Sequence, residues 1–176
     1  MLMKKAVFAG GCFWCIESDL IKLEGVIQVV SGYIGGTKAS ANYEAVCSGL
    51  TDHREAVLVT YDETLISYKE LVEYFFTCID PTNPYGQFAD IGDQYKTAIY
   101  YSDEKEKETA LKSKAELDQS GRFKDPVVTE ILEISDFYQA EDYHQKYYEK
   151  NADHYKRYRI GSGREGFIQI NWGDKR

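Results

Sequence analysis

The chain has 176 residues and a formal net charge of −8, with four cysteines, three histidines and fifteen tyrosines. This length suits one domain whose core needs no disulfides, so we expect residues 1–176 to form a single domain. The negative charge argues against a nucleic-acid or anionic-membrane surface. The sequence has no apolar run of about 18 residues, and its first apolar run breaks at Gly10, too early for a secretory signal. We therefore expect a cytoplasmic protein with reduced cysteines.

The first predicted elements are a strand and a helix that meet at a glycine pair. Residues 4–9 (KKAVFA) favour a strand, which ends at Gly10-Gly11. Apolar residues then recur at intervals of three and four, which predicts a helix beginning near Cys12 and ending at Gly25.

A second helix is predicted from the capping-box sequence Ser67-Tyr-Lys-Glu70, in which each of the two side chains satisfies a backbone amide. It should end at Asp80, because a residue that precedes proline disfavours the helical backbone. Residues 81–95 then form a long irregular segment, and such segments are often functional. The other predicted elements are helices at 102–121 and 139–151, strands at 25–36, 54–61, 97–101 and 127–134, and an irregular tail from Arg157.

These elements show no regular alternation of strand and helix, which favours an α+β fold over a parallel α/β fold. We expect a two-layer α/β sandwich that is ferredoxin-like, with helices on a mixed or antiparallel sheet and an irregular C-terminal tail.

Cys12 is the first candidate for chemistry. A cysteine in the first turn of a helix has its thiolate stabilised by free backbone N–H groups and by the helix dipole. Cys15 follows at i+3, where its thiol either reaches Cys12 to form a disulfide or packs inward. A zinc site needs a second pair of ligands at short spacing, and Cys47 and Cys78 are too far apart in sequence to provide one. We therefore expect no metal and no organic cofactor.

The residues next to these cysteines leave other readings open. Phe13 and Trp14 suit an ordinary core as well as the apolar wall of a binding pocket. Cys78 lies on the apolar face of its helix and is interpreted as a core residue, whereas the role of Cys47 is open. His144 is interpreted as a structural residue.

Nine segments, in the same order along the chain, resemble the class A peptide methionine sulfoxide reductases. A single short match would be weak evidence for a family, but nine matches in the family's order are strong evidence. The segments are GGCFWC, VVSGYIGG, NYEAVCSG, HREAV, YDETLISYKELVEYFF, DPT, QFADIGDQYKTAIYY, AEDYHQKYY and GSGREGF.

The resemblance implies an enzyme that reduces the S epimer of methionine sulfoxide, free or in proteins, with residues 1–176 as its single catalytic domain. Its nucleophilic thiol attacks the sulfoxide sulfur, releases methionine and is left as a sulfenic acid. The matching residues are Cys12 as the nucleophile, Glu55 as the acid that protonates the sulfoxide oxygen, Tyr43 and Tyr95 as the phenols that hold this oxygen, Phe13 and Trp14 as walls around the S-methyl group, and Asp90 as the carboxylate that orients the substrate's main-chain nitrogen.

Elementary chemistry agrees with these roles. The sulfoxide oxygen is a poor leaving group, so a thiolate displaces it only if a proton is supplied. A glutamate donates that proton at neutral pH only when burial raises its pKa, and an aromatic pocket provides such burial.

The sequence departs from the family pattern at the recycling cysteines. Many members carry them in the C-terminal tail, but no cysteine follows Cys78 here. We expect Cys15 to resolve the sulfenic acid as a disulfide that thioredoxin then reduces, with Cys47 or an external thiol as alternatives. We also expect a monomer. The competing interpretations are a thioredoxin-like thiol–disulfide oxidoreductase and a tyrosine-rich binding module with a structural CxxC.

Overall fold

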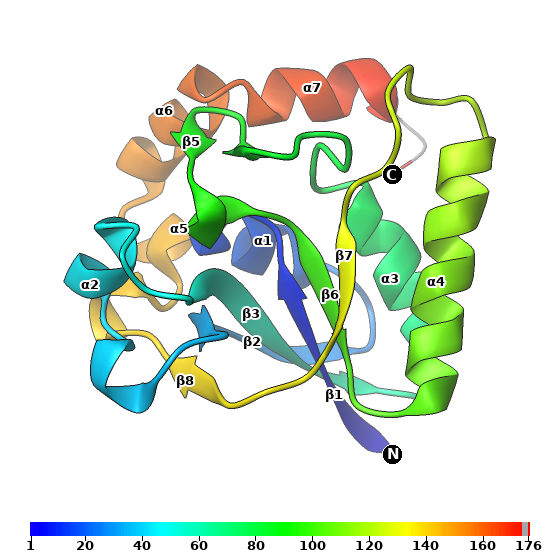
Figure 1. The fold of residues 1–176 in the computed structure, drawn as a ribbon, viewed down its shortest axis with the longest axis horizontal. Helices are drawn as coiled ribbons and strands as arrows, with labels where there is room; N and C mark the ends of the chain where they lie inside the picture. The colour runs from blue at the N-terminus through cyan, green and yellow to red at the C-terminus, as the bar shows by residue number, and fades with distance from the viewer. Residues whose placement is uncertain (174–175) are drawn as a thin grey trace.

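A computed structural model describes residues 1–173 and 176, and a six-stranded sheet lies at its centre (Figure 1). The strand order is β7-β6-β1-β3-β2-β8. All neighbours are antiparallel except β6 and β7, which are parallel. The predicted mixed sheet with helices is thereby confirmed. The strands are β1 (Met3–Ala9), β2 (Val26–Ile34), β3 (Arg54–Asp62), β6 (Ala98–Tyr101), β7 (Glu130–Glu133) and β8 (Phe137–Gln139).

Helices surround this sheet, and α6 and α7 lie beyond the end at which β1 finishes (Figure 1). A two-stranded hairpin of β4 (Gly86–Gln87) and β5 (Asp90–Ile91) interrupts the long segment after α3. The helices are α1 (Phe13–Leu20), α2 (Tyr43–Cys47), α3 (Tyr68–Phe76), α4 (Glu104–Gln119), α5 (Tyr147–Lys150), α6 (Ala152–Gly161) and α7 (Arg164–Asn171), with 3-10 turns η1 (Lys38–Ser40), η2 (Asp93–Tyr95) and η3 (Asp142–His144).

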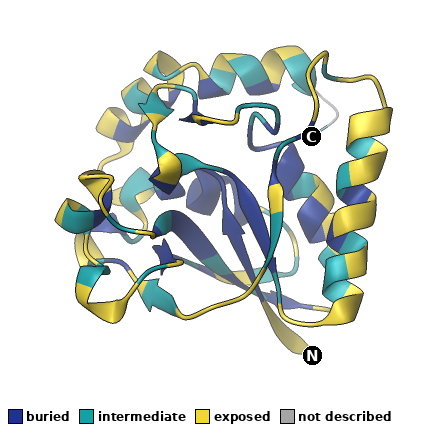
Figure 2. Cartoon of the chain, in the orientation of Figure 1, coloured by how far each residue is buried: buried dark blue, intermediate teal, exposed yellow. Residues whose placement is uncertain are grey.

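The main hydrophobic core lies on the face of the sheet that α1 and α3 cover (Figure 2). Side chains alternate between the two faces of a strand, so Phe8 and Val57 point into this core while Val7 and Ala56 join a smaller cluster on the other face. Phe8 stacks on Phe75 of α3 with ring centroids 4.8 Å apart. The same alternation puts residue 55 of β3 on the face that α1 covers.

The predicted capping box is present at the start of α3. The Ser67 hydroxyl accepts from the backbone N–H of Glu70, and the Glu70 carboxylate accepts from the backbone N–H of Ser67. The helix ends at Phe76, however, earlier than the expected stop at Asp80. The Thr77 hydroxyl donates to the carbonyl of Tyr74 at 2.6 Å, which satisfies an acceptor of the last turn without further helix.

The prediction of one helix over residues 139–151 is wrong. This stretch contains the end of β8, the turn η3 and the short helix α5, with Lys146 in a left-handed conformation at φ +52°. Several polar groups of this stretch bond to distant parts of the chain. The Gln145 side chain bonds both backbone groups of Ser31 at 2.9 Å, and the Lys146 N–H donates to Glu17 at 2.8 Å.

The prediction of an irregular C-terminal tail is also wrong, because α6 and α7 occupy most of that segment. The two helices turn arginines inward: Tyr155 and Arg159 are the buried residues of α6, and Arg164 and Ile168 are those of α7. A buried face made half of arginine carries no apolar periodicity, so the sequence pattern did not reveal these helices. Gly163, at φ +95°, allows the sharp turn between them.

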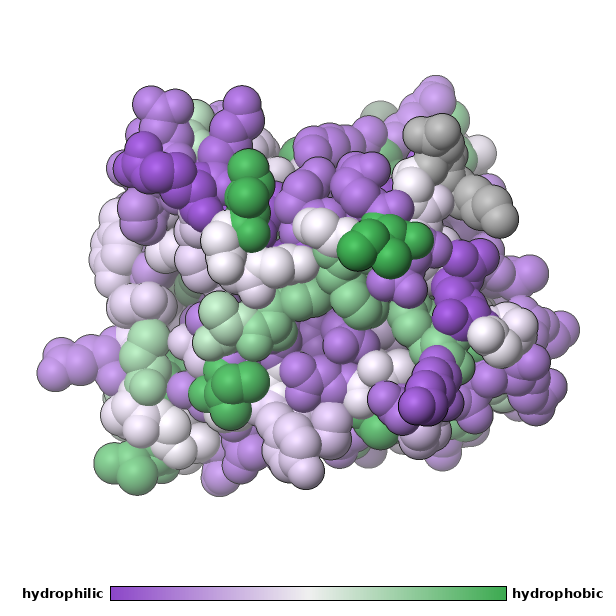
Figure 3. Space-filling view, turned by 90° about the horizontal axis from the view of Figure 1, so that it is seen from above, coloured by the Kyte–Doolittle hydropathy of each residue, from purple (hydrophilic) through white to green (hydrophobic). Residues whose placement is uncertain are grey.

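None of the described helices is long and apolar enough to span a membrane. Seen from above, the surface is largely hydrophilic, with hydrophobic side chains gathered in a band across its middle (Figure 3).

Candidate active site

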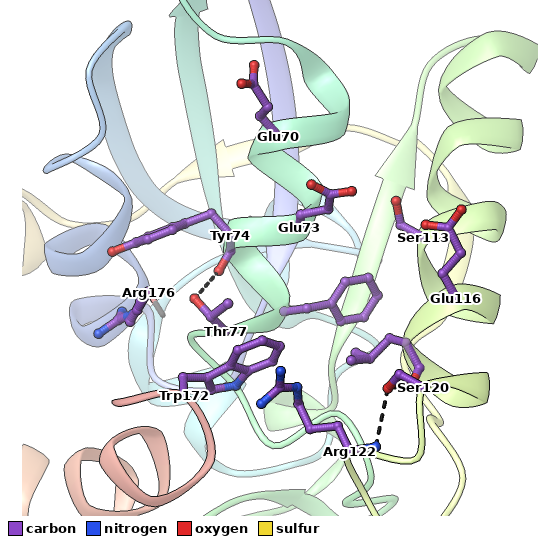
Figure 4. Close-up of a pocket in the computed structure, with 12 residues that line it drawn as sticks. Glu70, Glu73, Tyr74, Thr77, Ser113, Glu116, Ser120, Arg122, Trp172 and Arg176 are labelled. Carbon is purple, nitrogen blue, oxygen red and sulfur yellow. Dashed lines mark hydrogen bonds between the residues drawn. The ribbon is translucent and has the colours of Figure 1, made fainter. Parts of the chain in front are cut away.

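Seven of the eight predicted site residues line one cavity of about 70 Å³. The residue of the eight that is not in the lining is Cys15, which is fully buried behind it. A larger cavity of about 500 Å³, between α3, α4 and Trp172, contains none of the predicted residues (Figure 4). The lining of the small cavity is Cys12, Phe13, Trp14, Tyr43, Glu55, Asp90, Tyr95 and Tyr158.

Cys12 is the N-cap residue of α1, as the glycine pair predicted. Gly11 has φ +83°, and a Cβ placed on it would lie 2.6 Å from Cβ of Gln87. Glycine is therefore required on two counts, the backbone angle and the lack of space. Because of this turn, the Cys12 side chain lies at the cavity with only 5% of its surface exposed.

Glu55 lies opposite the start of α1. It follows the first residue of β3 and pairs with Tyr33 of β2, and its Oε1 accepts a hydrogen bond from the N–H of Phe13 at 3.1 Å. Burial raises the pKa of Glu55 to about 8, although the Phe13 N–H acts in the opposite direction. The carboxyl is only 3% exposed. It therefore holds a proton at neutral pH, as an acid catalyst must.

Two phenols complete the polar side of the cavity. Tyr43 is the first residue of α2, and its backbone N–H donates to Glu141 at 2.9 Å, which fixes the start of this helix. Tyr95 ends the turn η2. Burial raises the pKa values of both tyrosines above the ordinary value, so both hydroxyls remain protonated donors at neutral pH.

Trp14 forms an apolar wall that residues far along the chain hold in place. Its ring stacks on Tyr147 with centroids 3.9 Å apart, and its Nε1–H donates to Nδ1 of His144 at 3.0 Å. Burial lowers the pKa of His144, which keeps the imidazole neutral and able to accept this bond. Among the described residues, its buried Nε2 has no hydrogen-bond partner. His144 is thus a residue that positions Trp14.

Tyr158 lines the cavity although sequence reasoning missed it. It comes from α6, within the expected irregular tail, and its hydroxyl donates to Asp90. Burial, the charge of a Cys12 thiolate and this hydrogen bond raise its pKa, so it stays a donor. Five tyrosines lie between residues 143 and 158, and nothing in the sequence distinguishes this one.

Comparison with known proteins gives the same result as the geometry. The sequence profile of the family "Peptide methionine sulfoxide reductase" matches residues 4–176. This chain belongs to that family. It is 51% identical over 170 residues to "Peptide methionine sulfoxide reductase MsrA" of Bacillus velezensis, covering 97% of this chain and 96% of that protein. Over the same length and shares, it is 52% identical to the protein of that name from Bacillus subtilis.

Solved structures support the fold of this reductase. Mxr1 from Saccharomyces cerevisiae in reduced form is 31% identical, with a TM-score of 0.80 over 85% of this chain and 86% of that chain. Methionine sulfoxide reductase A of Corynebacterium diphtheriae is also 31% identical, with a TM-score of 0.74 over 85% and 76%. The family inferred from the nine segments and its activity, the reduction of methionine sulfoxide, are confirmed.

The thiols of this reductase differ in their surroundings. Cys12, Cys15 and Cys78 are buried and Cys47 is exposed, and all four are free. Burial raises the pKa of Cys12 well above its usual value, and its hydrogen bond to Cys15 adds to this effect. Burial also raises the pKa of Cys15, but the hydrogen bond from Cys12 and the nearby arginines outweigh it and lower the value to about 7. Above about pH 7, the two sulfurs therefore share one negative charge and one proton.

Cys47, the alternative resolving thiol, lies outside this cavity. It ends α2 one turn after Tyr43, and a hydrogen bond between its thiol and the Tyr43 hydroxyl helps to raise the pKa of Tyr43. In the described part of the chain, no group of three or more His, Cys, Asp or Glu residues is placed to hold a metal ion.

Proposed function

We propose that the chain reduces methionine-S-sulfoxide, free or in proteins, to methionine by attack of Cys12 on the sulfoxide sulfur. The observation that carries this proposal is a small cavity in which one thiol, one buried carboxyl and two phenols meet aromatic walls. The cavity has a volume of only about 70 Å³. It suits the CH₃–S=O end of the side chain and leaves the rest of the substrate outside.

The polar groups suit the oxygen of the sulfoxide. The protonated Glu55 supplies the proton that the departing oxygen needs, and the hydroxyls of Tyr43 and Tyr95 donate hydrogen bonds to the same atom. Phe13 and Trp14 surround the methyl group. Asp90, held by Tyr158, accepts a hydrogen bond from the main-chain nitrogen of the substrate.

The reaction balances in three steps. The Cys12 thiolate attacks the sulfoxide sulfur while Glu55 protonates the oxygen, and the oxygen passes to Cys12, which becomes a sulfenic acid as methionine leaves. Glu55 regains a proton from solvent, since its pKa is raised to about 8. The Cys15 thiolate then attacks the Cys12 sulfur, an S–S bond forms and the S–O bond breaks, and the departing oxygen takes the Glu55 proton and leaves as water. A dithiol such as thioredoxin reduces the disulfide by exchange and becomes oxidised itself.

Two observations support Cys15 as the resolving thiol. Its pKa is lowered to about 7, so a substantial fraction is thiolate at neutral pH, and its sulfur accepts a hydrogen bond from the Cys12 thiol. Cys47 interacts with Tyr43 on the outer side of the pocket and is the internal alternative.

The test compares single turnover with cycling in matched variants. Reduced protein without added reductant should form one methionine per chain, and Cys12→Ser should form none. Cys15→Ser should keep the single turnover and lose thioredoxin-supported cycling, whereas the control Cys47→Ser should retain both. Cycling that survives in Cys15→Ser and fails in Cys47→Ser would transfer the resolving role to Cys47. Reduction of insulin disulfides without methionine formation would favour the thioredoxin-like alternative.

We further propose that residues 1–176 act as a single catalytic domain and as a monomer in the cytoplasm. The single domain and the monomer are supported by the cavity, because one chain supplies every residue of its lining. The cytoplasm is supported by the thiols, because they must be reduced before each turnover and that compartment keeps thiols reduced. A ferredoxin-like, two-layer arrangement is also proposed, and its support is the antiparallel order β6-β1-β3-β2, with α1 between β1 and β2 and α3 between β3 and β6.

A further inference from the structure

Arg164, the first residue of α7, is a charged side chain that the proposed reaction does not use. It is only 1% exposed. Its Nη1 donates to the carbonyl of Cys78 at 2.8 Å and its Nη2 to that of Gly10 at 3.1 Å. The face of Phe88 lies 4.8 Å from the guanidinium carbon. Neutral carbonyls and a ring solvate this charge but do not neutralise it.

A buried cation without an anion is costly, because removing an ion from water costs several kcal/mol unless a partner compensates. Within residues 1–173 and 176, no carboxylate forms an ion pair with Arg164. The other buried arginine of this region is different, since Arg159 pairs with Asp19 at 3.1 Å and with Glu165 at 2.6 Å. Arg176 also pairs with Asp19, at 2.8 Å.

The two carboxylates that form ion pairs beside the thiols are matched without Arg164. Asp19 and Glu165 carry two negative charges, which Arg159 and Arg176 match. A third carboxylate, Asp90, is bonded by the Tyr158 hydroxyl and forms no ion pair with Arg164 among the described residues. The charges that act most strongly on Arg164 are those of Cys15 and Cys12. Glu55 is protonated at neutral pH because its pKa is raised to about 8, and the nearby tyrosines stay neutral. The titratable and charged groups that face the thiol pair come from every element packed around it. They are Asp19 on α1, Tyr43 on α2, Glu55 on β3, Asp90 on β5, Tyr95 on η2, Tyr155, Tyr158 and Arg159 on α6, and Arg164 on α7.

The guanidinium lies directly behind the turn that carries the nucleophile. It bonds to Gly10, two residues before Cys12, and a Cβ placed on Gly11 would lie 3.0 Å from its Nη2. We propose that Arg164 is a positioning residue that supplies the counter-charge of one thiolate shared by Cys12 and Cys15. This proposal rests on the proposed function for its consequences in the reaction, but the position of the guanidinium behind the thiols does not.

The counter-charge acts at two stages of the cycle. Before attack, the proton on Cys12 passes to the Cys15 thiolate, so the charge moves to Cys12 without leaving the field of Arg164. During recycling, a thiolate of the external dithiol attacks Cys12 and the S–S bond breaks, so Cys15 leaves as a thiolate. A thiol of lower pKa leaves faster, and a fixed cation beside the pair lowers that pKa.

The test is the pH dependence of alkylation at Cys12 and Cys15, followed by stopped-flow iodoacetamide labelling and peptide mass spectrometry in a Cys47→Ser background. Arg164→Met should raise the apparent pKa of the pair and slow labelling at pH 7 by roughly tenfold. Arg164→Lys should restore most of the rate because it keeps the charge. The control Arg122→Gln removes an exposed guanidinium that stacks on Trp172 and should change nothing.

An unchanged labelling profile in Arg164→Met, or an equal shift in Arg164→Lys, would overturn the proposal. If Arg164→Met does not fold, the Cys47→Ser protein with its native arginine still decides: thiolate absorbance at 240 nm should correspond to one thiolate per chain at pH 8, and zero or two would contradict it. If the unmodified protein forms no methionine from methionine sulfoxide, the proposed function is refuted. The effect of Arg164 on the pKa of the thiol pair would still be decided by the labelling experiment.

Discussion

Glu55→Gln should make the protein more stable while it removes the acid of the reaction. Glutamine has nearly the same shape and keeps an oxygen that can accept the Phe13 N–H, the bond that Glu55 now forms at 3.1 Å. It has no proton to give to the sulfoxide oxygen, so the single-turnover rate should fall by roughly 10²–10⁴-fold. In the unmodified protein the same step should slow as the pH rises above about 8, the pKa of Glu55.

The stability gain follows from the difference between the folded and unfolded pKa values. The ordinary glutamate value of 4.5 is raised to about 8 in the fold, so folding takes up a proton at any pH between the two. Stability from this group is therefore greatest below about pH 4.5 and falls as the pH rises towards 8. Each pH unit in that window costs about 1.4 kcal/mol, so the carboxyl destabilises the fold by roughly 3 kcal/mol at pH 7.

Urea unfolding of both proteins at pH 5 and pH 7 measures this effect. The free energy of unfolding of Glu55→Gln should exceed that of the unmodified protein by roughly 3 kcal/mol at pH 7 and by less than about 1 kcal/mol at pH 5. The control Glu133→Gln changes an exposed carboxyl and should give no pH-dependent gain. A difference between Glu55→Gln and the unmodified protein that stays constant from pH 5 to pH 7 would refute the argument that burial keeps this carboxyl protonated.

Three further substitutions test the turn before Cys12, the group that holds Asp90 and the partner of Trp14. Gly11 has φ +83° and no room for a Cβ, whereas Gly163 has φ +95° and open space around it. Gly11→Ala should therefore lower the free energy of unfolding by about 1–3 kcal/mol more than Gly163→Ala does. Equal losses would show that only the backbone angle matters. Tyr158→Phe should raise KM for N-acetyl-methionine sulfoxide by about tenfold and leave dimethyl sulfoxide, which has no main-chain nitrogen, unaffected; equal effects on both substrates would contradict the orienting role. His144→Ala removes the nitrogen that accepts the Trp14 indole N–H at 3.0 Å. The variant should have a kcat/KM about fivefold lower and a red-shifted Trp14 fluorescence. An unchanged spectrum would show that this hydrogen bond does not hold the ring.

The parts of the site that the sequence predicted are those set by neighbouring residues. The glycine pair before Cys12 favours a turn, and this turn places the thiol at the start of α1. The alternation of β3 likewise assigns Glu55 to the face of the sheet that α1 covers. Both conclusions need only a few adjacent residues.

The parts that the sequence did not predict depend on partners far along the chain. Arg164 bonds to a carbonyl 154 residues away, and Tyr158 bonds to a carboxylate 68 residues away. In the sequence pattern both side chains are typical of a solvent-exposed tail. Their burial becomes visible only when α6 and α7 pack over the start of α1, so no local pattern could have shown it.

Peptide mass mapping after one turnover shows which thiol attacks the sulfoxide and which thiol resolves the sulfenic acid. Reduced protein is mixed with excess methionine-S-sulfoxide, quenched with an alkylating reagent and digested, and the methionine formed is counted. We expect one methionine per chain, a disulfide that joins Cys12 to Cys15, and alkylated Cys47 and Cys78. A disulfide between Cys12 and Cys47 would contradict the resolving role of Cys15, and an alkylated, unoxidised Cys12 after methionine has formed would contradict the mechanism itself.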